Sequence, residues 1–127
     1  MEQSKDVVKN QVFIVTVGPE NPNKVAVALA QACHSKALGN NVLVFFVSNG
    51  FCWSLEGFDD VVDDCFGSIQ ELISNLCGLS AEMLVCQTCY DSMDRKGHDS
   101  LKEGVEIGTF TMMQDFINSG STVVFSY

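Results

Sequence analysis

Two of the six cysteines in this sequence stand close together, as Cys86 and Cys89 of a Cys-Gln-Thr-Cys run. A cysteine thiolate is a nucleophile and a metal ligand, and in a cytosolic protein such a pair is more often catalytic or metal-binding than a structural disulfide. The other four cysteines are Cys33, Cys52, Cys65 and Cys77. They lack the paired spacing of a disulfide framework or a zinc finger. Thiol chemistry is therefore the first hypothesis, and it centres on the pair.

The pair stands where a strand is expected to pass into a helix. The apolar run 83–86 ends at Cys86, and Thr88 with Asp91 resembles the start of a capped helix, which puts Cys89 in the first turn. Free backbone N–H groups and the helix dipole favour a thiolate there, so we expect a depressed pKa for Cys89. The alternative is that both cysteines are small apolar residues filling a strand end.

Positive charge is scarce in this chain but follows the pair closely. Arg95, Lys96 and His98 come within about two to three helical turns of Cys89. The chain as a whole carries a formal net charge of -9, from 16 acidic and 7 basic side chains. An acidic surface repels nucleic-acid phosphates and anionic lipid, so neither is expected as a partner. No apolar run reaches the roughly 20 residues of a membrane helix, and no signal peptide follows the first six residues, so a cytoplasmic protein is predicted.

Strand-like and helix-like segments alternate from end to end. Five apolar runs are expected to be strands, at 11–17, 42–47, 83–86, 104–108 and 122–125. Helix starts are indicated at Asn21-Pro22, at Ser68 with Glu71, and at Thr111 with Gln114, the last with Met112, Phe116 and Ile117 facing inward. This alternation predicts one α/β domain over 1–127, with 1–10 as an N-terminal extension and a mostly parallel sheet of about five strands.

Sites in such sheets form at the carboxyl ends of the strands. No phosphate-loop spacing and no GxGxxG are present, so no cofactor is predicted. His34 falls in a helix and His98 in a polar loop, without a nucleophile elbow. The long connection 51–67 is aromatic, and a connection of this length tends to be functional or interfacial; a short helix over 59–65 is possible within it.

Two stretches resemble the DsrE/DsrF-like family, which includes the TusD-type sulfur-relay subunits. The first runs from Val12 to Gly50, with Gly18-Pro19-Glu20 after the strand and a Pro-containing helix start. The second is the strand that ends in Cys86-Gln87-Thr88-Cys89, followed by Arg95-Lys96-Gly97. The last helix and strand also fit, so the resemblance covers about residues 11–127.

The resemblance implies a three-layer α/β/α sandwich that assembles into trimers or hexamers and carries a persulfide on one cysteine. Matched by its spacing to Arg95-Lys96-Gly97, Cys89 falls on the sulfur-carrying position, with Thr88, Arg95 and Lys96 in support. Against members in which CxTC is followed sooner by Arg-Gly, Cys86 aligns with the first cysteine instead. We prefer Cys89, because the helix-start argument selects it independently.

The leading hypothesis is a persulfide carrier that exchanges sulfur with donor and acceptor proteins. Cys86 resolves the persulfide in this scheme, and no metal is required. One alternative is a CxxC dithiol redox protein, and another is a zinc site that recruits Cys52 and Cys65. The last is a non-catalytic assembly subunit, whose segment 51–67 packs at an interface through Phe51, Trp53 and Phe58.

Overall fold

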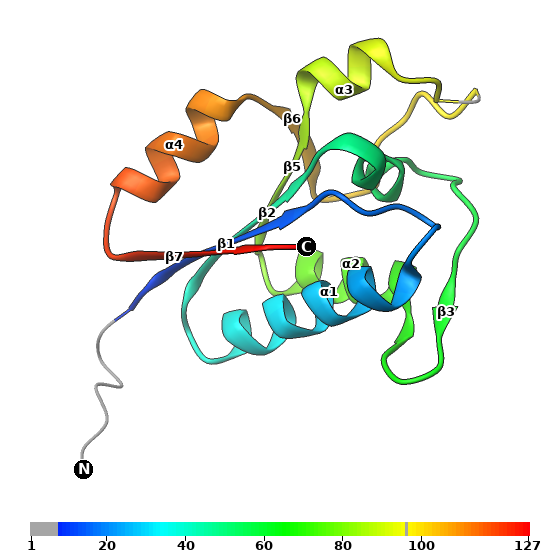
Figure 1. Ribbon diagram of the computed structural model, residues 1–127. Helices are drawn as coiled ribbons and strands as arrows, with labels where there is room; N and C mark the ends of the chain where they lie inside the picture. Colours follow the sequence, from blue (N-terminus) through cyan, green and yellow to red (C-terminus); the bar gives the residue numbers. More distant parts are fainter. Residues whose placement is uncertain (1–7, 96) are drawn as a thin grey trace.

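The computed structural model describes residues 8–95 and 97–127, and its centre is one parallel five-stranded sheet (Figure 1). The strand order is β6-β5-β2-β1-β7, and every neighbouring pair is parallel. The bounds are Asn10–Val15 for β1, Asn41–Phe46 for β2, Glu82–Cys86 for β5, Val105–Gly108 for β6 and Thr122–Ser126 for β7. The five predicted strands are confirmed, each within two residues of its expected limits.

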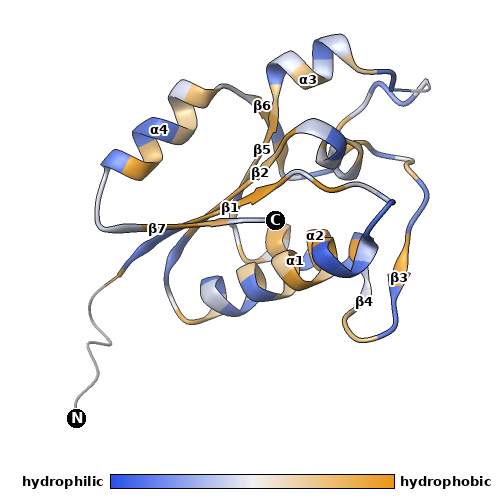
Figure 2. Ribbon diagram, in the orientation of Figure 1, coloured by the Kyte–Doolittle hydropathy of each residue, from blue (hydrophilic) through white to orange (hydrophobic). Residues whose placement is uncertain are grey.

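Helices cover the two faces of this sheet. Helices α1 (Pro22–Ala37) and α2 (Ile69–Gly78) pack on one face and α4 (Phe110–Asn118) on the other, while α3 (Gln87–Ser92) follows the carboxyl end of β5 (Figure 1). Two apolar cores result, one on each face of the sheet. The strands in the middle of the sheet, such as β2 and β5, are largely hydrophobic in Figure 2, as strands covered on both faces must be. The predicted α/β class is confirmed.

Two helix starts follow the predicted capping chemistry. The Asn21 side-chain oxygen accepts a hydrogen bond from the Lys24 N–H at 3.3 Å, and Pro22 is the first helical residue. Ser68 Oγ accepts from the Glu71 N–H at 3.0 Å and begins α2. Each cap satisfies an N–H that has no partner inside the helix.

The start of α4 differs from the prediction. Thr109, not Thr111, is the cap, and its Oγ1 accepts from the Met112 N–H at 3.2 Å. The shift of two residues turns Met112 outward, where it is 39% exposed, and it brings Met113 inward beside Phe116 and Ile117. Both threonines offer the same capping chemistry, and the one directly after β6 begins the helix.

The connection after β2 does not form the short helix at 59–65 that the sequence allowed. It forms a 3-10 helix η1 (Ser48–Ser54) and then a hairpin of β3 (Val62–Asp63) and β4 (Gly67–Ser68). The Asp63 carboxylate accepts hydrogen bonds from the N–H groups of Cys65 and Phe66, which closes the hairpin turn instead.

The aromatic side chains of this connection serve the core. Phe51 is 6% exposed and Trp53 is 2% exposed, and the Trp53 ring meets Phe58 edge-on at a centroid distance of 5.6 Å. Their predicted place at a protein interface is therefore wrong for Phe51 and Trp53, since both side chains are buried within the chain.

The amino-terminal strand begins inside the predicted extension 1–10. Asn10 already pairs with Asn41 and Thr122 on its two sides, and residues 1–7 lie outside the described part of the chain. Within the described part, no helix has the length and apolar character needed to span a membrane.

Candidate functional site

Cys86 and Cys89 lie at the carboxyl end of β5, between the ends of β2 and β6. Cys86 is the last residue of the strand, pairs with Gly108 of β6 and is 4% exposed. Helix α3 begins at the next residue, so Cys89 lies in its first turn as predicted, partly exposed and packed against both apolar cores. The fold thus presents Cys89 to the surface and keeps Cys86 beneath it.

The predicted cap of α3 is absent. The N-cap residue is Cys86, without a side-chain capping bond, because the strand passes directly into the helix and Thr88 is already helical. Thr88 instead lines a hollow of about 380 Å³ between the starts of α3 and α4, and Cys86 also borders this hollow. Cys86 thus borders a hollow although only 4% of it is exposed.

Ser48 supplies the closest polar partner of the Cys89 sulfur. The Ser48 N–H points at Cys89 Sγ, with a nitrogen–sulfur distance of 3.2 Å. Ser48 lies two residues after the end of β2 and has a φ of 58°, in the left-handed region that few residues other than glycine adopt. Sequence reasoning missed this residue, since a serine between Val47 and Asn49 carries no local sign of a thiol partner.

The surroundings of Cys89 act on its pKa in opposite directions. Burial raises the pKa of the thiol, the hydrogen bond from Ser48 lowers it, and contact with the Cys86 side chain raises it again. The net pKa lies above the ordinary value of 9.0, opposite to the depressed pKa that the sequence predicted. Burial prevails because a single backbone donor does not replace the hydration that the thiolate loses.

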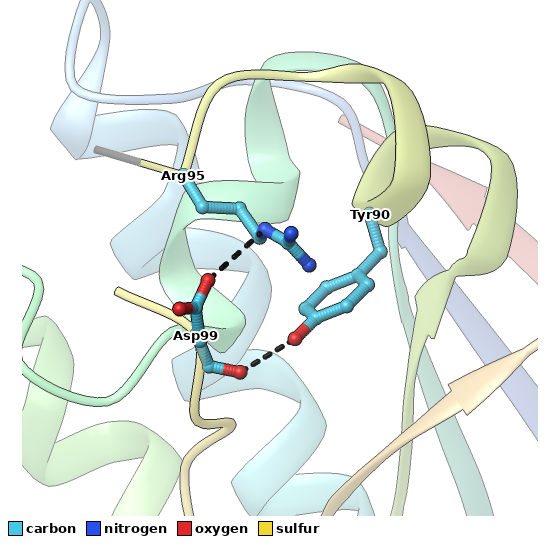
Figure 3. A network of polar contacts seen from close by, with 3 residues as sticks. All are labelled: Tyr90, Arg95 and Asp99. Atoms are coloured by element: carbon cyan, nitrogen blue, oxygen red, sulfur yellow. Dashed lines mark hydrogen bonds and ion pairs between the residues drawn. The ribbon is translucent and has the colours of Figure 1, made fainter. Parts of the chain in front are cut away.

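Arg95, one of the positive residues that the sequence placed near the pair, is engaged by two other side chains. The guanidinium of Arg95 lies over the Tyr90 ring, 4.2 Å from its centroid, and its Nε is 3.5 Å from a carboxylate oxygen of Asp99. The Tyr90 hydroxyl donates to the backbone oxygen of Asp99, so these three residues brace the segment after α3 (Figure 3). Arg95 therefore has partners of its own, and Lys96 lies outside the described residues.

The four-thiolate zinc site also fails to assemble. Cys52 is buried in η1, whereas Cys65 is exposed at the turn of the β3–β4 hairpin. Among the described residues, no group of three or more cysteine, histidine or acidic side chains is arranged to hold a metal ion. The described cysteines therefore do not support the zinc alternative.

The fold is a parallel α/β sandwich with a cysteine pair at the carboxyl end of β5. The model of the DsrE/DsrF-like family matches residues 9–125, so the chain belongs to that family, whose members are generally associated with sulfur relay. The crystal structure of the ychN protein from E. coli has the same fold, with a TM-score of 0.77 and 20% sequence identity over 95% of this chain and 100% of that one. No curated protein matches the sequence.

Proposed function

We propose that this protein is a sulfur carrier that accepts and donates sulfane sulfur on Cys89. The observation that carries the proposal is the position of Cys89 Sγ, partly exposed at the carboxyl end of the sheet, 3.2 Å from the Ser48 N–H and in contact with Cys86. Membership of the DsrE/DsrF-like family supports the same chemistry.

The transfer is a pair of thiol exchanges. The Cys89 thiolate attacks the terminal sulfur of a donor persulfide, the sulfur–sulfur bond of the donor breaks, and the donor leaves as a thiol after taking up a proton. Cys89 then carries the extra sulfur. An acceptor thiolate attacks that terminal sulfur in turn, and Cys89 leaves as the thiolate that began the cycle.

In this proposal the Ser48 N–H stabilises the thiolate form of Cys89. A donor fixed in the backbone stabilises negative charge on the sulfur, both on the attacking thiolate and on the leaving thiolate. The raised pKa keeps most of the resting Cys89 as a thiol at neutral pH. The resting site is thereby protected from oxidation, and sulfur uptake becomes faster as pH rises.

Cys86 is placed to resolve the persulfide. Its thiolate attacks the Cys89 sulfur, the bond to the terminal sulfur breaks, and hydrosulfide leaves while a Cys86–Cys89 disulfide forms. A thiol reductant must then restore the pair. The same contact between the two side chains favours a second candidate function, a reversible dithiol–disulfide couple without carried sulfur.

Sulfur transfer requires other proteins. We infer that the chain works in the cytoplasm with separate sulfur donor and acceptor proteins, and that it assembles as a homo-oligomer, a trimer or a hexamer. The resemblance to the DsrE/DsrF-like family supports the assembly. Apolar side chains exposed on β7 and α4 support it as well, namely Val123, Val124, Phe110 and Met112.

Cyanolysis after incubation with a persulfide donor tests the proposal, because cyanide removes sulfane sulfur as thiocyanate. We expect thiocyanate from the wild type and from Cys65→Ser, which changes an exposed cysteine in the hairpin turn. We expect none above background from Cys89→Ser. Equal thiocyanate from Cys89→Ser and the wild type contradicts the assignment to Cys89.

A further inference from the structure

A second hollow opens at the same end of the sheet as the cysteine pair. It has a volume of about 340 Å³, and neither Cys86 nor Cys89 lines it. Its walls come from four segments, the turn after β1, helix η1, the residues just before β3 and the segment after α3. This is the edge at which open parallel sheets bind ligands.

Close backbone packing builds the wall between β1 and η1. A side chain on Gly50 would lie 2.2 Å from the Val15 carbonyl oxygen, and one on Gly18 would lie 2.7 Å from that of Asn49. The Trp53 indole N–H donates to the Val17 carbonyl at 2.9 Å and fastens the two segments. The wall is therefore preformed.

One carboxylate is held in a fixed orientation at the rim. Glu20 accepts a hydrogen bond from the Gly18 N–H at 3.1 Å and one from the Asn49 side-chain amide at 3.3 Å. A hydrogen bond from the Glu20 backbone N–H lowers the pKa of the Glu20 carboxyl most, and the bonds from Gly18 and Asn49 lower it further, so the group is charged at neutral pH. A carboxylate has about four acceptor positions, so these three hydrogen bonds leave about one of them for a ligand.

The floor of the hollow is apolar and uncharged. Phe51, Cys52 and Leu55 form it, each at most 6% exposed, and Phe58 stands at its side. Burial raises the pKa of Cys52 to about 12, so its thiol stays protonated. The floor suits a hydrocarbon or aromatic group.

The charges around the hollow favour a cation. The carboxylates of Glu20, Asp59 and Asp94 line it together with the guanidinium of Arg95 and the side chain of His98, and Asp94 already has an interaction partner. Arg95 is already paired with Asp99. A chain with a net charge of -9 also attracts cations from a distance.

We propose that this hollow binds a small organic amine, with its protonated amino group at Glu20 and its apolar body on Phe51, Leu55 and Phe58. The inference goes beyond sulfur transfer, because the amine occupies a site that does not include the cysteine pair. Its chemical class is a primary amine on a hydrocarbon or aromatic group that fits about 340 Å³.

Titration calorimetry with three probes of similar size tests the proposal: 2-phenylethylamine, 2-phenylethanol and 3-phenylpropionate. We expect the amine to bind more tightly than the alcohol and the carboxylate not to bind. Because a hydrogen bond between charged groups is lost, we expect Glu20→Gln to weaken amine binding roughly tenfold. Asp59→Asn removes an exposed carboxylate of the rim, and we expect a smaller loss from it.

Two variants serve as controls. Glu82→Gln makes the same change at an exposed residue at the start of β5, the opposite edge of the sheet, and leaves amine binding unchanged. Cys89→Ser also leaves it unchanged, which separates this proposal from the sulfur-carrier proposal. Tighter binding of the carboxylate, no binding of the amine, or equal amine affinity in the wild type and Glu20→Gln overturns the proposal.

Discussion

The backbone N–H of Ser48 donates a hydrogen bond to Cys89 Sγ across a sequence separation of 41 residues. Ser48 follows β2 and Cys89 lies in the first turn of α3, so the pairing of β2 with β5 brings them together. The sheet therefore creates the polar environment of the sulfur, and its influence can be measured through the reactivity of Cys89.

Cys86 is predicted to restrain the ionisation of Cys89. Contact with Cys86 is one of the causes that raise the Cys89 pKa, so Cys86→Ala shifts this pKa down and increases the thiolate fraction at neutral pH. Alkylation of Cys89, followed by peptide mass spectrometry across neutral and alkaline pH, should show a midpoint at lower pH. Cys33→Ala, at a half-buried cysteine in α1, is the control and leaves the midpoint unchanged. An unchanged midpoint in Cys86→Ala contradicts the coupling.

Lys102 is predicted to stabilise the end of η1. Its ammonium donates to the carbonyl oxygens of Trp53 at 3.0 Å and Leu55 at 2.8 Å. Lys102→Met leaves both carbonyls without this donor and lowers the free energy of unfolding by about 2 kcal/mol, measured by urea denaturation. Lys24→Met, at an exposed position in α1, changes it by less than about 0.5 kcal/mol. Equal stability of the two variants rules out this role.

Asp63 makes the hairpin sensitive to acid. The Asn23 side chain, together with the N–H groups of Phe66 and Cys65, holds the pKa of Asp63 below its ordinary value of 3.8. The stabilisation is therefore present above pH 3.8 and is lost as pH falls through the lower folded pKa.

Thermal melts at several pH values check this. We expect Asp63→Asn to have a lower Tm than the wild type at neutral pH. The difference in Tm between the two proteins becomes smaller in acid. Asp64→Asn, at the exposed neighbour, keeps the wild-type pH dependence. A gap that stays constant down to the lowest pH contradicts the linkage.

The elements of this fold were predictable because their signals are local. Apolar runs of strand length and the caps at Asn21 and Ser68 depend on neighbours within four residues. The place of Cys86 at the carboxyl edge followed from the strand it ends.

What sequence reasoning missed depends on tertiary contacts. The Ser48 donor, the burial that raises the Cys89 pKa and the pairing of Arg95 with Tyr90 and Asp99 all need the folded chain. The prediction of where α4 starts was wrong for another reason. Thr109 and Thr111 have the same capping chemistry, and only Thr109 follows the strand directly.

The proposed homo-oligomer can be tested by measuring its mass in solution. We expect light scattering to give a solution mass of three or six times the 13.9 kDa of one chain. Burial of apolar side chains that are exposed on β7 and α4, such as Val124 and Phe110, is the expected driving force. A mass of one chain at all concentrations contradicts the homo-oligomer.

The central claim is that Cys89 carries sulfur, and intact mass after exposure to a persulfide donor tests it most directly. Carried sulfur adds about 32 Da, and a thiol reductant removes it, whereas the sulfinic acid of similar mass resists reduction. The account predicts a reducible adduct in the wild type and in Cys86→Ser and its loss in Cys89→Ser. A reducible adduct that survives in Cys89→Ser and disappears in Cys86→Ser, or no reducible adduct in any of the three proteins, contradicts it.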